Sequence, residues 1–551
     1  MLSIISFVGF TVLVAVIAWY ATRKTDETSA DGFYLGGRSL GALTIAGSLL
    51  LTNLSAEQIV GLNGQAFSEG ILVMAWETLA AIAIIATAIF LLPKYMSSGI
   101  TTIPEFIEGR FDQGTRAIMA VLFLIAFGIV LLPTILYSGS LAFSTMFDLP
   151  ELFGMSQSTV IWLCVWSIGI IGIIYAIFGG LKAVAVSDLI NAVGLMIGGL
   201  LIPFFGLSVI GNGSVMDGLN TLWNSNPEKF NAVGDVTSSI PFGTIFTGMM
   251  IAQIYYWGTN QSILQRVFGA KNLAEGQKGM IAAAFVKFLI PVIVVLPGII
   301  AWHVFEGNLE NTDQAYPALV KKVLPTVFIG FFAAVLFGAV LSSFNSLLNS
   351  SATLFGSDLY KQNFNKNSTE KQSVKAGKIA GLILALISMS IAPFIANAPD
   401  GLFSYIQQAL GSLSVPILAV VLTGIISKRV PATGAKTVLI AGVLMYLFSL
   451  LYLGPNTIEA AVSEATANGI SNTNEIAIIK AKAYPHFLHV MGILFVINML
   501  IMLIFRLVKP KKDEEIYIPQ VTEIIDTTPW KYTLPVGLFI VILVLATYVI
   551  F

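Results

Sequence analysis

Three ionisable side chains, Glu57, Glu77 and Lys287, stand inside apolar stretches long enough to cross a membrane. Placing a charge at the middle of a bilayer costs about 2.5–3.5 kcal/mol on insertion scales. Each group therefore needs a partner or a water-filled cavity, and we expect Glu77 and Lys287 to offset each other's charge near the bilayer midplane. A purely structural ion pair is the alternative, because such pairs also occur in helix bundles.

Amide and aromatic side chains near this pair extend the polar set. A carboxylate accepts hydrogen bonds from hydroxyl groups, an ammonium group donates to them, and a primary amide such as Gln58, Gln253 or Gln407 does both. Such a set is suited to a neutral sugar. An anionic substrate would require a spare cation, and the predicted spans contain no arginine to supply it. Four aromatic residues nearby are suited to stacking on a sugar ring or, singly, to ordinary packing: Trp76, Tyr256, Trp257 and Phe403.

A run of hydroxyl side chains in the ninth predicted span includes Ser342, Ser343 and Ser346. Hydroxyls at i, i+1 and i+4 place at least two oxygens on one helix face. Backbone carbonyls freed near Leu51 and Leu54 at a helix break could complete the shell of a sodium ion, as coupling-ion sites in transporters are built. Serine and threonine hydroxyls in membrane helices commonly bond to their own helix, so the run alone does not establish a sodium site.

The elements that must position these residues are membrane helices. The chain has 551 residues, of which 56% are hydrophobic and only 11% are charged, and its mean hydropathy is +0.85. In soluble domains, about a quarter of all residues are charged. Because about 20 helical residues cross a hydrocarbon core about 30 Å thick, the apolar runs predict an all-α membrane protein with about fourteen spans. We expect the run from Leu2 to Tyr20 to be a retained helix, not a cleaved signal.

The sequence excludes several functional classes. The net charge of −1 and the scattered basic residues offer no surface for nucleic acid. The single cysteine, Cys164, excludes a disulfide framework, and His486 and His489 lack a third metal ligand nearby, so we expect an interfacial polar pair. An enzyme would need a nucleophile with its base or a metal cluster, and a channel would need a continuous polar pore. A structural or sensory membrane bundle is the non-transporter alternative.

Basic residues are distributed unequally between alternate loops. If the N-terminus is outside, one set of loops holds most of the 29 lysines and arginines, and the other holds only Lys229, Lys321, Lys322, Lys480 and Lys482. Basic residues are enriched in cytoplasmic loops. We therefore expect a multi-pass protein of the plasma (cytoplasmic) membrane with both termini on the outer face.

Two predicted spans carry polar runs at membrane depth, at residues 52–58 and 253–261. Such runs are tolerated where they face protein or water, commonly at a helix break. The two runs are five spans apart, an odd number, which predicts two five-helix units of opposite orientation. Polar packing within a structural bundle is the alternative. The predicted organisation is an extra helix at 1–22, a first inverted repeat at 42–210, a second at 243–427, and three C-terminal helices at 434–551.

Several short motifs, taken together, give the chain a specific family resemblance. They are Tyr34–Arg38, Asn53–Gln58, Ile103–Phe106, Gly179–Val184, Tyr255–Gly258, Asn260–Gln261, Gln265–Arg266, Leu296–Gly298 and Ser342–Ser343, with Lys287. With these motifs the sequence resembles the solute:sodium symporters, in particular the sodium/glucose cotransporter branch that includes bacterial sodium/galactose cotransporters. The resemblance extends from the first helix to about Arg429, whereas the last three helices match mainly by hydropathy.

This resemblance implies a leucine-transporter-type core of five plus five inverted helices, and sodium-coupled import of a hexose such as galactose or glucose by alternating access. It implies sugar ligands at Gln58, Glu77, Lys287 and Gln407, with Gln253 and Trp257 beside the sugar. It implies an inner gate at Tyr256, with Asn53 as its hydrogen-bond partner, and an outer gate at Leu62, Trp76 and Phe403. It implies a sodium site made by the carbonyls of Leu51, Leu54 and Ala339 and the hydroxyls of Ser342 and Ser343.

Departures from the family pattern limit what the resemblance implies. Gln253 stands where galactose cotransporters have an asparagine, Ala80 replaces a serine and Trp76 replaces a gate tyrosine. Changes of about one methylene are worth about 1–3 kcal/mol of selectivity, so the identity of the sugar is left open, with inositol, an amino acid or sialic acid as alternative substrates. A second sodium ion at Asp188 and Ser346 is also left open. In relatives that bind one, a hydroxyl residue stands where this chain has Asn345. The oligomeric state is not indicated.

Overall fold

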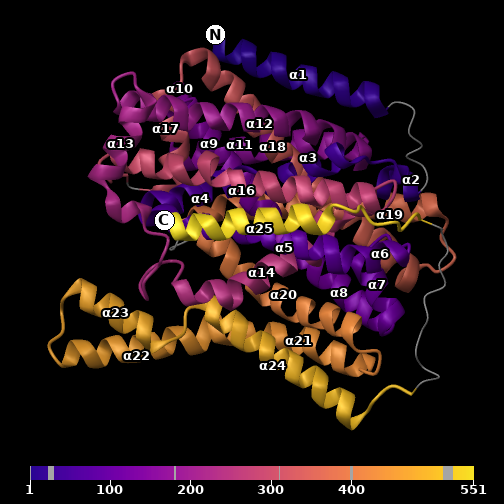
Figure 1. The fold of residues 1–551 in the computed structure, drawn as a ribbon. Coiled ribbons are helices and arrows are strands. Elements are labelled where there is room, and N and C mark those ends of the chain that lie inside the picture. Colours follow the sequence, from indigo (N-terminus) through magenta and orange to yellow (C-terminus); the bar gives the residue numbers. More distant parts are fainter. Residues whose placement is uncertain (1, 23–29, 179–180, 310, 398–400, 513–524) are drawn as a thin grey trace.

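The protein is a bundle of α-helices that run roughly side by side (Figure 1). The structure, a computed structural model, describes residues 2–22, 30–178, 181–309, 311–397, 401–512 and 525–551. Within these ranges there is no β-strand. Gly179 and Gly180 of the family motifs, and short stretches of each predicted domain, lie outside the described residues.

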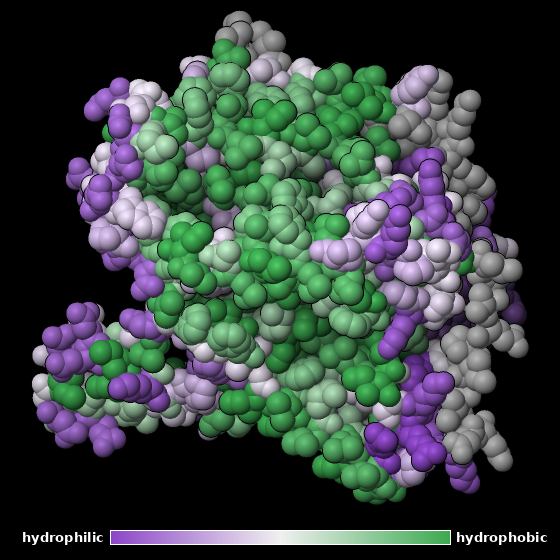
Figure 2. Space-filling model, viewed as in Figure 1, coloured by the Kyte–Doolittle hydropathy of each residue, from purple (hydrophilic) through white to green (hydrophobic). Residues whose placement is uncertain are grey.

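The surface has the distribution expected of a protein embedded in lipid. Figure 2 shows apolar residues over the middle of the visible face and hydrophilic residues gathered at its left and right margins. Among the described residues, eleven helical segments are long and apolar enough to cross a membrane. The predicted all-α membrane class is therefore confirmed.

Eleven segments are fewer than the fourteen predicted spans because some helices are divided and others are joined. Helix α3 (Ala42–Asn53) is a shorter apolar helix, and α14 (Gly248–Gly258) has only 11 residues. Helix α4 (Ala56–Glu69) continues without a gap into a helical segment that ends at Ser97. The number of spans stays a prediction.

The first predicted interruption separates α3 from α4. Leu54 leaves the helical conformation with φ −84° and ψ 68°, and Ser55 is extended. The Ser55 amide donates to the carbonyl of Asn53 and therefore does not make the helical bond to Leu51. The prediction of a break in this polar run is confirmed, and the break frees a carbonyl inside the bundle.

The second predicted interruption separates α14 from α15 (Gln261–Phe268). Thr259 and Asn260 lie between the two helices. The Asn260 side chain accepts a hydrogen bond from the Ser262 amide at 2.9 Å and so caps the start of α15. This interruption is confirmed too.

Long helices surround the two interrupted segments. These longer helices are α1 (Leu2–Thr22), α5 (Ala75–Ala86), α8 (Gln113–Ile125), α9 (Leu132–Met146), α11 (Gln157–Phe178), α12 (Leu181–Ile210), α16 (Leu273–Val304), α18 (Thr326–Thr353), α19 (Glu370–Ile391), α20 (Gly401–Ile426), α21 (Ala432–Phe448), α24 (Phe487–Val508) and α25 (Thr533–Ile550). Helix α16 packs against α3, α4 and α5, and α18 packs against α12 and α1. Their assignment to two inverted repeats stays a prediction.

The chain's two ends lie toward the same side of the bundle, at the left of Figure 1. Helices α22 (Gly454–Ala467) and α23 (Thr473–Ala483) project from the bundle at the lower left. Helix α25 runs back along α16 and α5.

Candidate functional site

A cavity lies where the two interrupted segments approach α5, α16 and α20. Its empty volume, which includes space open to solvent, is about 710 Å³. Nine of the eleven residues predicted to bind substrate or to gate it line this cavity: Asn53, Gln58, Trp76, Glu77, Gln253, Tyr256, Trp257, Lys287 and Gln407.

The predicted ion pair lies in the wall of this cavity. The Lys287 ammonium group on α16 donates to Glu77 Oε2 on α5, and both side chains are buried. Gln58 Nε2, just after the first break, donates to Glu77 Oε1 at 2.6 Å. The prediction that Glu77 and Lys287 meet in a polar cavity is confirmed. Each oxygen of the carboxylate thus has a donor, which offsets the desolvation of the charge.

The second interrupted segment supplies the facing wall. Gln253 Nε2 donates to the Trp76 carbonyl at 2.6 Å, so this amide ties α14 to α5 and presents its oxygen as the remaining acceptor. The Trp257 ring centroid lies 5.7 Å from Lys287 Nζ, in cation–π range. Tyr256 is half-buried at the cavity.

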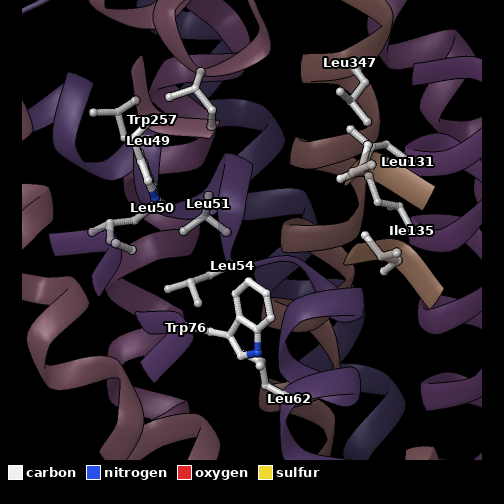
Figure 3. Packing of buried hydrophobic residues seen from close by; sticks show 14 of the residues in the cluster. Leu49, Leu50, Leu51, Leu54, Leu62, Trp76, Leu131, Ile135, Trp257 and Leu347 are labelled. Carbon is white, nitrogen blue, oxygen red and sulfur yellow. The ribbon is translucent and has the colours of Figure 1, made fainter. Parts of the chain in front are cut away.

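The predicted outer-gate residues form an apolar cluster next to the part of the cavity wall that contains Trp76. The rings of Trp76 and Phe403 meet edge to face with centroids 5.2 Å apart. Figure 3 shows the Trp76 indole beside Leu54 and Leu62. Leu62 and Phe403 are buried but, unlike Trp76, are not among the residues that line the cavity. The structure therefore brings the three together, with Trp76 alone facing the cavity.

Two of the five predicted sodium ligands are in contact between α3 and α18, and the other three are buried on the same segments. Ser343 Oγ donates to the freed Leu51 carbonyl at 2.8 Å, and Ala339, Ser342 and Leu54 are buried. Within the described part of the chain, the Ser342 hydroxyl makes no hydrogen bond of good geometry. A freed carbonyl and an under-used buried hydroxyl are oxygen donors that fit a hard cation, so the donor set is chemically suitable for sodium.

The residues considered for a second sodium ion lie next to this set. Asp188 on α12 is buried, and one of its oxygens accepts from Ser48 Oγ at 2.6 Å. Ser346 Oγ lies 3.3 Å from Thr52 Oγ1. Asn345, the departure from the family pattern, is buried on the same helix. A carboxylate and several hydroxyls are therefore present beside the first set.

The expectation that no arginine lies inside the spans is wrong. Arg116 falls within the candidate span Gln113–Met146. Arg266, on α15 and outside the candidate spans, is fully buried. Arg116 Nε donates to Asp358 at 2.6 Å, and Arg266 Nε donates to Thr52 Oγ1 at 3.0 Å. Neither lines the cavity. The reason is tertiary: both were assigned to loops, but buried acceptors from distant helices surround them.

Sequence reasoning missed the apolar part of the cavity. Leu131, Ile406, Leu410 and Met491 also line it. An apolar residue in a membrane helix carries no signal that separates a cavity wall from a lipid-facing or core position. Met491 is the least expected, because α24 lies outside the predicted repeats.

Helix α25 braces the two helices that carry the ion pair. The Tyr548 hydroxyl lies 3.1 Å from Thr78 Oγ1 on α5, and the Thr533 hydroxyl at the start of α25 donates to Gln277 Oε1 on α16 at 3.1 Å. We expect Tyr548→Phe to lower the free energy of unfolding by about 0.5–1.5 kcal/mol, because one hydrogen bond is lost. Thermal unfolding in detergent measures this. Tyr452→Phe, at an exposed tyrosine, is the control, and an equal shift in both variants would contradict the brace.

Comparisons with known proteins agree with this architecture. A family model described as "Sodium:solute symporter family" matches residues 33–442. An uncharacterized symporter, YidK, of Escherichia coli is 44% identical over 530 residues, which cover 96% of this chain and 87% of the relative. The sodium/glucose cotransporter of Vibrio parahaemolyticus is 32% identical over 81% of this chain and 85% of the relative. The human sodium/myo-inositol cotransporter 2 is 29% identical over 80% and 68%.

Among solved structures, a Na+-coupled sialic acid symporter in a substrate-bound outward-open state superposes with a TM-score of 0.68 at 20% identity. The match covers 93% of this chain and 99% of that one. At this identity the likeness shows the fold, which is the leucine-transporter type.

Proposed function

This chain belongs to the sodium:solute symporter family, and from that premise we propose that it uses the sodium gradient to import a neutral sugar. It is a secondary transporter and not an enzyme. The observation that carries the proposal is the buried Glu77–Lys287 pair, joined by Gln58, in the wall of the cavity.

The polar wall is suited to a neutral polyol. The Lys287 ammonium group is already neutralised by Glu77, so it offers hydrogen bonds without a net positive charge. Carboxylate, ammonium and amide groups together both donate to and accept from hydroxyls. Two of the relatives reported above carry glucose or myo-inositol in their names, and both are polyols. An inositol is therefore the second candidate, since it would engage the same groups.

The buried arginines do not favour an anionic substrate. Arg116 is paired with Glu108 and Asp358, and Arg266 donates to Thr52 and to the Ser262 carbonyl. Neither is available in the cavity wall. This supports a sugar over sialic acid or another anion.

Sodium is the co-substrate in this proposal, held by Leu51, Leu54, Ala339, Ser342 and Ser343. The broken first helix carries ligands for both substrates, because Leu51 precedes the break and Gln58 follows it. Sodium that bridges α3 to α18 fixes the position of this break. The sugar then binds to a site that is already formed, so the affinity of each substrate rises with the other.

Closure and release follow alternating access. Trp76, Phe403 and Leu62 close the outer side of the site over the sugar, and Tyr256 with Asn53 controls release to the inside. Both termini face outward. With about 100 mV, inside negative, one sodium ion contributes about 2.3 kcal/mol, and a tenfold sodium gradient adds about 1.4 kcal/mol. One ion then sustains a sugar gradient of about 500-fold. A second ion, held at Asp188 and Ser346, would square this factor.

Uptake by the purified full chain in proteoliposomes tests the proposal. Labelled glucose, galactose, myo-inositol and a neutral amino acid are offered with an inward sodium gradient, and again with choline in place of sodium. We expect accumulation of at least one polyol in sodium alone. Sodium-dependent uptake of the amino acid only would overturn the sugar assignment, and equal uptake in choline would overturn the coupling.

A further inference from the structure

One wall of the cavity comes from a helix outside the predicted repeats. Met491 on α24 lines the cavity and is 1% exposed. The charged and amide groups come from α3, α4, α5, α14, α16 and α20, all within residues 42–427. The cavity is therefore completed by the C-terminal part of the chain, beyond residues 33–442 that the family model matches.

Close helix packing holds Met491 in this place. Gly248 starts α14, and a Cβ there would lie 1.8 Å from the Leu488 carbonyl oxygen of α24. Gly492 faces the same contact, since its Cβ would lie 3.1 Å from Thr247 Cβ. Only glycine permits so close an approach at the first of these positions. The two helices therefore touch along their backbones one residue from Met491.

A polar contact fixes the rotation of α24 at this level. His489 Nδ1 lies 3.0 Å from Thr247 Oγ1. With 3.6 residues per turn, Met491 lies about 160° around the helix axis from His489. His489 and Gly492 therefore contact the start of α14, while the Met491 side chain lines the cavity.

We propose that Met491 is a specificity-determining residue that sets the size of the substrate accepted by this site. The inference rests on the proposed function and adds to it the property of the sugar that the site discriminates, which is its size. The polar wall holds the ring hydroxyls, and the apolar wall formed by Leu131, Ile406, Leu410 and Met491 faces the less polar side of the substrate. A thioether side chain is unbranched and adapts to irregular surfaces, so it contacts a hexose without presenting a competing polar group.

The test compares hexoses with the smaller pentoses as competitors of labelled uptake. We expect Met491→Phe to shift the hexose-to-pentose ratio of kcat/KM toward pentoses by about tenfold, since the larger ring takes space from the substrate and one methylene is worth about that factor. Met491→Ala is expected to raise KM for hexoses and to weaken discrimination. Met491→Leu conserves volume and is expected to restore the wild-type ratio.

Met502 provides a matched control. It is a second methionine on α24, also 1% exposed, and it does not line the cavity. Met502→Ala removes the same atoms from the same helix and is expected to lower stability without a change in the hexose-to-pentose ratio. The sodium concentration for half-maximal uptake is expected to be unchanged in all variants, because Met491 lines the cavity and none of the five proposed sodium ligands does.

The outcomes separate this inference from the proposed function. An unchanged ratio in both Met491→Phe and Met491→Ala, in folded protein with sodium-driven sugar uptake, overturns the role of Met491 and leaves the function standing. If the wild-type chain accumulates another class of solute, the sugar assignment fails. Pairs of larger and smaller members of that class then test Met491 in the same way, with an unchanged ratio again overturning it.

Discussion

Lys287→Met is expected to abolish sodium-driven sugar uptake and to lower the free energy of unfolding by about 3–5 kcal/mol. The substitution removes the donor from Glu77 Oε2 and leaves a carboxylate buried with only Gln58 to satisfy it. Removing one partner of a buried pair leaves an uncompensated charge, and this has a cost of that size. Uptake in proteoliposomes and thermal unfolding in detergent measure the two effects.

A double variant distinguishes recognition from folding. Glu77→Gln combined with Lys287→Met removes both charges, and we expect it to recover most of the lost stability because neutral replacements of buried pairs are often tolerated. Uptake is expected to stay absent, since the sugar hydroxyls lose both charged partners. Restored uptake in the double variant would mean that the pair is purely structural.

Lys278 on the same helix is the matched control. It forms an ion pair with Glu275 at 2.8 Å, but its side chain is 40% exposed. Exposed pairs contribute about 0–1 kcal/mol. Lys278→Met is therefore expected to change neither uptake nor stability by more than this small amount, and a loss as large as that of Lys287→Met would show that any lysine of α16 has the same effect.

Ser343→Ala is expected to raise the sodium concentration for half-maximal uptake by about 10- to 100-fold, while the order of preference among sugars stays the same. The hydroxyl touches the freed Leu51 carbonyl between α3 and α18 and is not part of the cavity wall. Interactions of a polar group with a charge are worth about 1.5–3 kcal/mol, and every 1.4 kcal/mol is tenfold in affinity. Uptake titrated with sodium at saturating sugar measures the shift.

Ser350 gives a control on the same helix. Its buried hydroxyl donates to Gln265 Oε1 at 2.8 Å, seven residues beyond Ser343. Ser350→Ala loses one hydrogen bond, about 0.5–1.5 kcal/mol of stability, and is expected to leave the sodium titration in place. Equal damage by Ser343→Ala to sodium affinity and to sugar selectivity would refute the separation of the two sites.

The amino-acid sequence alone predicts the membrane class, the two helix breaks and the contact between Glu77 and Lys287. These inferences have a common physical basis, because lipid penalises every exposed charge and every unsatisfied backbone group. A carboxylate and a lysine in separate apolar runs, each following a polar interruption, leave few arrangements other than contact. The hydroxyl run at Ser342 and Ser343 was placed against the break by the same reasoning joined to the family resemblance.

The partners of the remaining polar and apolar groups depend on how the helices pack in three dimensions. Gln253 donates its amide nitrogen to the Trp76 carbonyl. Arg116 and Arg266 are buried against acceptors from distant helices. Met491 lines the cavity from α24. In each case the partner is remote in sequence and chemically ordinary. The local sequence pattern indicates how unfavourable it is for a residue to face lipid or water. It does not indicate which neighbour will bind that residue, because the packing of whole helices determines the neighbour.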